Sequence, residues 1–161
     1  MSEIISPENT ELLTQLLGDI QNRAYIDVVR DVQQQVTDHC DLIDVPVFHH
    51  FAPNVYMRQM DAAAGTLVVS KMHRTEHMNI LLKGSVTIVT ENGIEFLQAP
   101  LILKSAAGTK RIGYFHEDSS WVTVHPTTET DLELIEQQVI VPDDEIEQFL
   151  ASLPSKCKEI E

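Results

Sequence analysis

Cysteine, glycine and basic residues are scarce in this sequence. Its 161 residues include two cysteines, Cys40 and Cys157, six glycines, and 11 lysines and arginines against 25 aspartates and glutamates. The cysteines lie far apart and outside any metal-type spacing, so we expect neither a disulfide framework nor a zinc ribbon, and a reducing cytoplasm is the expected compartment. No apolar run approaches the roughly 18 residues that cross a bilayer, and the N-terminus lacks a basic-then-apolar signal pattern.

The shortage of basic residues gives the chain a formal net charge of -14 and a pI near 4.7. A protein this acidic is not expected to bind nucleic acid or an anionic membrane surface. The charge is unevenly distributed, because residues 1–44 carry -7, residues 127–161 carry -8 and residues 45–126 carry +1. The middle block also holds six of the seven histidines, so we expect the chemistry of the protein there: His49, His50, His73, His77, His116 and His125.

Amphipathic segments at both ends of the chain predict helices. Residues 6–8, Ser-Pro-Glu, are typical of a helix start, and leucines follow at helical spacing. Residues 28–36 place four valines on one face of a second helix, which we expect to pack on the domain rather than on a partner subunit. A last helix is expected from residue 142 or 143 to residue 153, where Pro154 ends it.

The middle of the chain predicts strands. From Val45 onward, short apolar runs alternate with turn residues, which indicates about eight strands in a sandwich or barrel rather than a parallel sheet. The pair Asn92-Gly93 between two such runs predicts a hairpin. We therefore divide the chain into an N-terminal helical extension (1–44), a β-barrel (45–141), and a C-terminal helix and tail (142–161).

The stretch from Gly65 to Gly84 has an informative spacing. It reads as a glycine, five residues, Lys71-x-His73, three residues, His77, six residues and a glycine. This spacing resembles the first motif of the cupin barrels, in which His-x-His and a glutamate occupy those places. Lys71 stands where the first metal histidine of the family would be, and His77 stands where the glutamate would be.

A second cupin motif is matched more weakly between Pro100 and Arg111. The length and the turn glycine, Gly108, are kept, but Arg111 stands where the third metal histidine would be. The resemblance implies a mainly β fold, a single jelly-roll barrel that binds a small molecule at its open mouth and commonly pairs as a homodimer. Of the four usual ligand positions, two still suit a metal and two hold cations.

Strand parity suggests which residues would replace the missing ligands. If His73 points into the barrel, Lys71, Val69 and Leu67 share its face, because side chains alternate along a strand. Trp121, Thr123 and His125 likewise share one face of a later strand.

On this interpretation His73, His77 and His125 form a three-histidine site for a divalent transition metal (Zn, Fe, Mn or Ni), which would act in a metal-dependent enzyme. Glu76 is then the candidate acid or base.

The alternative interpretation needs no metal. Lys71, Lys110 and Arg111 would grip an anionic group such as a phosphate or a carboxylate, with Trp121 as aromatic support. Simpler structural roles also remain open for these residues. Lys71 and Arg111 can form ion pairs with acids such as Glu76, Trp121 can belong to the core, and the His49-His50 pair can be hydrogen-bonded near a strand end.

Residues 45–140 also resemble a narrower set of proteins, through the blocks HHFAPNVYMRQM, HRTEHMNILLKGSVTIVTENG and GTKRIGYFHEDSSWVTVHPTTETDLELIE. These blocks are similar to small cupin-like proteins of tailed bacteriophages and prophages, which implies a protein made inside a bacterial host cell but no particular activity. Three functions stay open: a metal-dependent enzyme, a non-catalytic sponge for an anionic host metabolite or nucleotide signal, and a structural virion protein. The histidines and cations gathered in a near-neutral middle block favour ligand handling.

Overall fold

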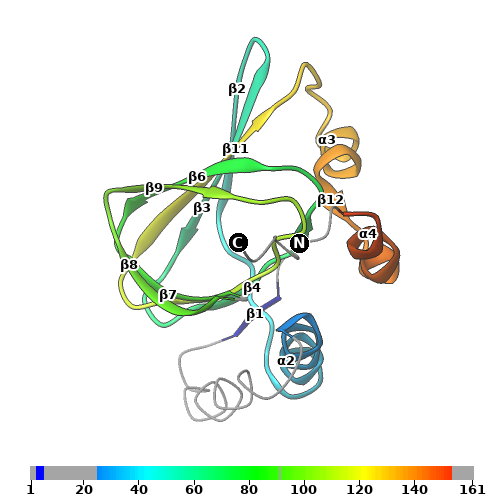
Figure 1. Cartoon of the computed structure of the whole chain (residues 1–161). Helices are drawn as coiled ribbons and strands as arrows, with labels where there is room; N and C mark the ends of the chain where they lie inside the picture. The colour runs from blue at the N-terminus through cyan, green and yellow to red at the C-terminus, as the bar shows by residue number, and fades with distance from the viewer. Residues whose placement is uncertain (1–2, 6–24, 91, 154–161) are drawn as a thin grey trace, which may run out of the picture.

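Two antiparallel sheets form the body of the protein (Figure 1). The computed structural model describes residues 3–5, 25–90 and 92–153. In spatial order, sheet A contains β1 (Glu3–Ile5), β4 (Leu67–Val69), β10 (Ile112–Phe115), β7 (Ser85–Thr90) and β8 (Gly93–Gln98). Sheet B contains β2 (Val47–Ala52), β3 (Val55–Ala62), β11 (Ser119–Pro126), β6 (His77–Lys83) and β9 (Leu101–Ser105). A small ribbon pairs β5 (Met72–His73) with β12 (Ile140–Val141).

The strand pairing is nested. Strand β3 pairs with β11, β4 with β10, β6 with β9, and β7 with β8. Successive pairs thus run from the outside of the chain segment to its middle, and they alternate between sheets B and A, which is the arrangement of a jelly roll. The mainly β, jelly-roll fold expected from the sequence is therefore confirmed. The innermost pair, β7 with β8, is the hairpin that Asn92-Gly93 predicts, and Gly93 has a φ of +118°.

The helix α2 (Tyr25–His39) covers the outer face of sheet A (Figure 1). Its four buried valines recur at positions 28, 29, 32 and 36, and they pack against Leu67, Val69, Val89 and Ile112 of the sheet. This packing confirms the helix and its docking on the domain. The helix expected to start at residues 6–8 lies outside the described residues.

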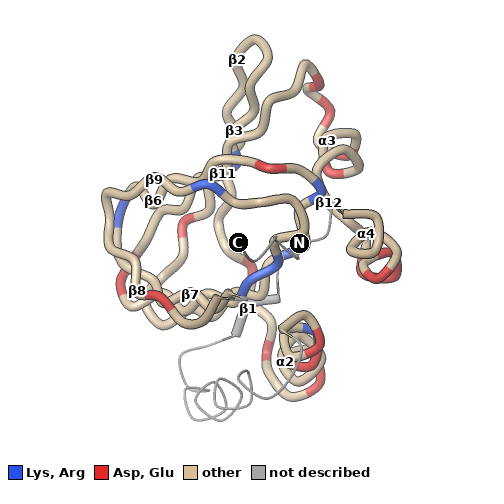
Figure 2. The backbone as a smooth tube through the Cα atoms, viewed as in Figure 1, with Lys and Arg blue, Asp and Glu red and all other residues tan. Residues whose placement is uncertain are grey.

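The C-terminal helices lie at one end of the two sheets, beside β12 (Figure 1). A 3-10 turn, η3 (Asp143–Glu145), leads into α4 (Ile146–Ser152), so the expected last helix is confirmed with a tighter first turn. A further helix, α3 (Leu132–Val139), was not predicted; the Asp131 carboxylate caps it by accepting hydrogen bonds from the backbone N–H groups of Glu133 and Leu134. Acidic residues gather on α2, on α4 and around the start of α3 (Figure 2). Among the described residues, no helix is long and apolar enough to cross a membrane.

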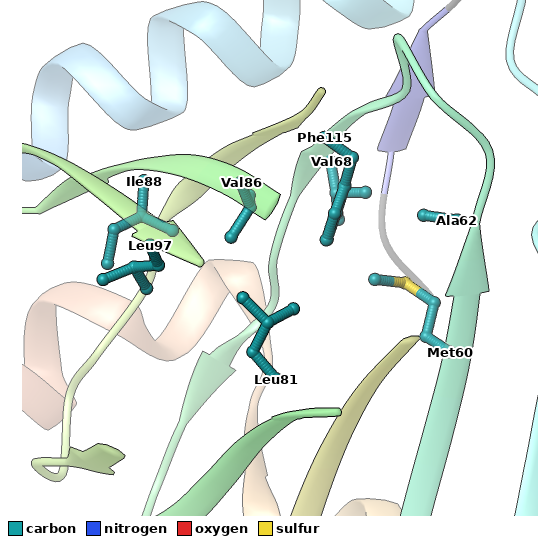
Figure 3. Close-up of a cluster of buried hydrophobic side chains, with 8 residues drawn as sticks. All are labelled: Met60, Ala62, Val68, Leu81, Val86, Ile88, Leu97 and Phe115. Atoms are coloured by element: carbon teal, nitrogen blue, oxygen red, sulfur yellow. The ribbon is translucent and has the colours of Figure 1, made fainter. Parts of the chain in front are cut away.

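The apolar core lies between the two sheets. Met60 and Leu81 of sheet B meet Val68, Val86 and Phe115 of sheet A in one buried cluster (Figure 3). Trp121 of β11 packs against this cluster, and His125 lies four residues further along the same strand.

The parity expected for residues 67–73 is wrong. Leu67 and Val69 point away from the interior, toward α2, whereas Val68 points between the sheets. Residues 70 and 71 belong to no strand, because the chain leaves β4 there and starts β5, which pairs with β12 instead of β10. The alternation that starts at Leu67 therefore does not continue through to His73.

Candidate functional site

A cavity of about 280 Å³ lies between the sheets. It is close to the lower end of the roughly 300–1,000 Å³ usual for small-molecule pockets. Side chains of both sheets line it, and α3 contributes Leu132, Ile135, Glu136 and Val139 on one side.

The sheet B wall of the cavity is ordered in layers by the strand register. Tyr56 stands opposite His125, Arg58 opposite Thr123, and Met60 opposite Trp121. On the other side of β11, Asn79 is the partner of Thr123 and Leu81 is the partner of Trp121. Because side chains alternate along each strand, these residues share the inner face. The wall therefore changes from histidine and tyrosine, through arginine, threonine and asparagine, to an apolar floor.

Three histidines meet at the top of this wall. The ring centroid of His73 lies 4.2 Å from that of His77 and 5.6 Å from that of His125, and the last two are 5.3 Å apart. His77 donates its Nδ1–H to the carbonyl oxygen of Thr75 at 2.9 Å, which leaves Nε2 as the unprotonated nitrogen. The buried Nδ1 of His125 has no hydrogen-bond partner among the described residues.

Burial keeps these histidines uncharged. It lowers the pKa of His73 to about 2, with further contributions from the nearby His77, His125, Arg111 and Arg58. Burial and the neighbouring His77 lower the pKa of His125 to about 4. Burial also lowers the pKa of His77, although its bond to the Thr75 carbonyl acts in the opposite direction. At neutral pH the cluster therefore presents neutral imidazoles.

Two arginines supply positive charge to the cavity. Arg111 donates from Nη2 to Ser105 Oγ, and its guanidinium carbon lies 5.8 Å from the centre of the Trp121 ring. Its Nε is buried and has no hydrogen-bond partner among the described residues. Burial lowers the pKa of both guanidinium groups, and the nearby Tyr56 and Glu136 act in the opposite direction on Arg58. Both arginines still carry charge at neutral pH, since an arginine ordinarily titrates above about 12.

A single carboxylate faces these cations. Of the described residues that line the cavity, only Glu136 is acidic, and it forms a hydrogen-bonded ion pair with Lys71. That hydrogen bond lowers the pKa of Glu136. Glu136 also acts on Arg58 through space, in the direction that raises the arginine pKa, but neither Arg58 nor Arg111 forms an ion pair with a carboxylate among the described residues.

The histidines suit a transition metal in chemistry but not in placement. Neutral imidazole nitrogens are good ligands for zinc, iron and nickel. Within residues 3–5, 25–90 and 92–153, however, no group of three or more histidine, cysteine or acidic side chains is placed to hold a metal ion. The neighbouring Arg58 and Arg111 charges also oppose a divalent cation, and no carboxylate in the cluster offsets them.

Solved structures of similar fold come from several bacteria. A cupin-2 domain protein from Shewanella frigidimarina matches 60% of this chain and 92% of its own length at 12% identity, with a TM-score of 0.42. A cupin superfamily protein from Desulfitobacterium hafniense matches 52% of this chain and 77% of its own length at 13% identity, with a TM-score of 0.45. The cupin-2 domain of an XRE family transcriptional regulator from Enterobacter cloacae matches 52% and 97% at 12% identity, also with a TM-score of 0.45.

These are cupin-domain proteins, and their similarity to this chain, with TM-scores below 0.5, says nothing of its function. No protein-family model matches the chain. No curated protein matches it in sequence.

Most of the residues singled out from the sequence lie around the cavity. His73, His77 and His125 come together there, and Lys71, Arg111 and Trp121 also line it. On β11, Trp121, Thr123 and His125 share the inner face, as parity predicts. Lys71 pairs with Glu136 rather than with the acids considered from the sequence.

Glu76 and Lys110 are not part of the cavity lining. The Glu76 side chain is 61% exposed and its carboxylate lies 3.5 Å from Lys104 Nζ, so the acid–base role expected for it has no support from its position and stays a prediction. Lys110 is 1% exposed and lies 3.7 Å from Asp143, on the side of the C-terminal helices. Its Nζ donates to the carbonyl oxygen of Ser70 at 2.8 Å, so its position gives no support to the expected ligand-binding role, which stays a prediction. Lys110 supports the structure beside the cavity.

Sequence reasoning missed Arg58, Tyr56 and Glu136. Arg58 and Tyr56 alternate with apolar residues on β3, and only the pairing of β3 with β11 shows that they face the histidines. Glu136 lies on α3, whose place at the rim no local pattern reveals. The predicted hydrogen bonding of His49 is confirmed, since its Nδ1 lies 2.7 Å from the Tyr56 hydroxyl, yet His49 also lines the cavity.

Proposed function

We propose that the protein binds a small anionic molecule in the cavity between its two sheets. The observation that carries this proposal is the pair of arginines, Arg58 and Arg111, which line the cavity without forming an ion pair to a carboxylate among the described residues; Glu136, the single acid of the lining, is hydrogen-bonded to Lys71. A carboxylate or phosphate group bound by guanidinium forks is a strong, charge-assisted interaction, and the buried setting strengthens it. The neutral nitrogens of His73 and His125 can donate or accept hydrogen bonds beside the same group.

The proposal is one of ligand binding, as in a sponge for an anionic metabolite of a bacterial host. The expected acid or base, Glu76, lies away from the cavity, and the carboxylate at the rim, Glu136, is engaged by Lys71. The arginines and neutral histidines of the wall support binding of an anion rather than proton transfer.

Binding of simple probes tests the proposal. Trp121 is the single tryptophan of the sequence and lines the cavity, so its fluorescence reports occupancy directly. We expect benzoate to bind, and uncharged benzamide of the same shape to bind far more weakly. Arg58→Gln and Arg111→Gln should each weaken benzoate binding by roughly tenfold or more, since hydrogen bonds to charged groups are worth about 1.5–3 kcal/mol.

The matched control is Arg30→Gln, which removes a surface arginine on α2 whose partner is Glu147. This control should bind benzoate like the unmodified protein. Equal binding of benzoate and benzamide, or unchanged binding in both cavity variants, contradicts the proposal.

A second candidate is a divalent transition metal held by the three histidines. It is supported by the uncharged imidazoles of His73, His77 and His125 alone, since among the described residues no such group is placed to hold a metal ion. Elemental analysis of protein purified without chelator or affinity nickel tests it. A near-stoichiometric metal that disappears in the His73→Ala/His77→Ala double variant would establish the metal site, and a folded, metal-free protein would remove it.

A further inference from the structure

We infer that the anionic ligand carries its charged group on a flat apolar ring, which lies between the sheets against Gly113. The inference rests on the proposed function. That proposal concerns the charged group of the ligand, and the inference concerns the rest of the molecule. It comes from the wall of the cavity that sheet A provides, which differs in character from the wall of sheet B.

Three residues of β10 and its approach face the cavity in sequence. Arg111 offers a cation, Gly113 has no side chain, and Phe115 belongs to the buried floor. The intervening Ile112 packs on the other side, against α2. Residues two apart on a strand are separated by roughly 7 Å along its axis. A carboxylate bound at Arg111 therefore has open space beside it, over Gly113, for the group that carries it.

The space over Gly113 has apolar sides. The partners of Gly113 on the neighbouring strands are Val68 of β4 and Ile88 of β7, and both line the cavity. A Cβ built on Gly113 would meet only Val86 Cγ2, at 3.4 Å, and no other atom within 4 Å. The backbone there is thus exposed to the cavity as a flat surface between two branched side chains, which suits an aromatic ring better than a bulky or charged group.

The opposite wall supports the same orientation. Arg58 and Thr123 face each other on the paired strands of sheet B, and the next layer holds Met60 and Trp121. A ring lying on Gly113 thus has an apolar face toward sheet A and a polar edge toward the arginines and histidines. A body of this kind gains free energy from burial that a bare anion does not, roughly 25 cal/mol for each Å² removed from water.

Two comparisons test the inference at constant charge. Benzoate should bind at least about tenfold more tightly than acetate, and phenyl phosphate more tightly than inorganic phosphate, measured by Trp121 fluorescence and by calorimetry. The relative affinities of benzoate and phenyl phosphate also show whether the site prefers a carboxylate or a phosphate group. Gly113→Val, which fills the space over the strand, should weaken benzoate binding by about tenfold or more and leave acetate binding unchanged.

Gly113→Ala provides a milder variant, because its Cβ meets only Val86, and should weaken benzoate binding in the same direction if Gly113→Val does not fold. Equal binding of acetate and benzoate, or undiminished benzoate binding in both glycine variants, overturns the inference while the arginine-dependent binding of anions stands. Failure of all four anions to bind overturns the proposed function and the inference together.

Discussion

The imidazole rings of His73 and His77 lie 4.2 Å apart between centroids, with an angle of 31° between their planes. His73 is reached by a short strand of the β5–β12 ribbon, and His77 is the first residue of β6 in sheet B. Two imidazoles this close cannot both be protonated without strong repulsion, and burial adds to that cost. In the folded protein, protonation of either imidazole is therefore unfavourable, and both stay neutral.

Acidification should destabilise the protein through these histidines. The pKa is about 2 for His73 and about 4 for His125 in the folded state, below the ordinary value of 6.5. Between those values the unfolded chain binds more protons than the folded one, so stability is full above about pH 6.5 and falls as the pH drops toward 4 and then 2. Each histidine contributes up to about 1.4 kcal/mol per pH unit in this range.

Urea denaturation between pH 7.5 and 5 measures this dependence. His73→Gln should flatten the curve, because glutamine does not titrate, whereas His39→Gln at the exposed end of α2 should leave the slope as it is. If the free energy of unfolding depends on pH equally in His73→Gln and in the unmodified protein, His73 is not a source of the acid destabilisation.

Removing the rim carboxylate should strengthen anion binding. Glu136→Gln deletes a negative charge at the cavity and releases Lys71 from its ion pair. We expect benzoate to bind roughly fivefold more tightly, a gain of about 1 kcal/mol, because both partners are partly exposed and solvent screens the effect. The control is Glu133→Gln, an exposed residue of the same helix that does not line the cavity. Weaker binding in Glu136→Gln would show instead that the carboxylate helps to shape the site.

Gly84 should tolerate no side chain. Its φ is +88°, and a Cβ there would lie 2.0 Å from Ser119 Oγ and 2.8 Å from the carbonyl oxygen of Asp118. Gly84→Ala should therefore lower the free energy of unfolding by more than about 2 kcal/mol, through strain and displacement of the turn before β11. Gly93→Ala is a matched comparison, because Gly93 also has positive φ but nothing within 4 Å of its Cβ. Denaturant titration of both variants measures how much of the lost free energy of unfolding comes from the steric clash at residue 84. Equal losses in the two variants would contradict the clash.

The docking of α2 on sheet A should contribute measurably to stability. Val32 is 1% exposed and belongs to the cluster between the helix and the sheet. Val32→Ala should cost about 2 kcal/mol, from lost burial and the cavity left behind. Gln35→Ala on the exposed face of the same helix should change the free energy of unfolding by less than about 0.5 kcal/mol. An unchanged free energy of unfolding in Val32→Ala would mean that packing of α2 on sheet A contributes little to stability.

The strands, the hairpin at Asn92-Gly93 and the helix with four buried valines were predictable, because each follows from periodicity or turn chemistry within a few residues. The meeting of His73, His77 and His125 was expected from the motif resemblance and from parity on β11. Parity failed at residues 67–73 because the chain changes pairing partners at residues 70 and 71, which no alternation of residue types records.

The remaining site residues could not be predicted from the sequence, because they reach the cavity through contacts between distant segments. Arg58 reaches the histidines only through the register of β3 with β11, and Glu136 through the position of α3. Glu76 lies next to His77 in sequence but outside the cavity lining, because neighbours at the start of a strand point to opposite faces.

The nested order of the strands also bears on how the protein folds. The central strand of sheet B, β11, is the last strand of the jelly roll to leave the ribosome, and it must insert between β3 and β6. Tyr56 and His125, partners across that junction, are separated by most of the barrel's length in sequence. Such high contact order slows folding to about milliseconds to seconds. A nascent chain that ends before residue 119 therefore lacks the strand that joins β3 to β6, and ligand-binding competence should arise in one late step rather than grow with chain length.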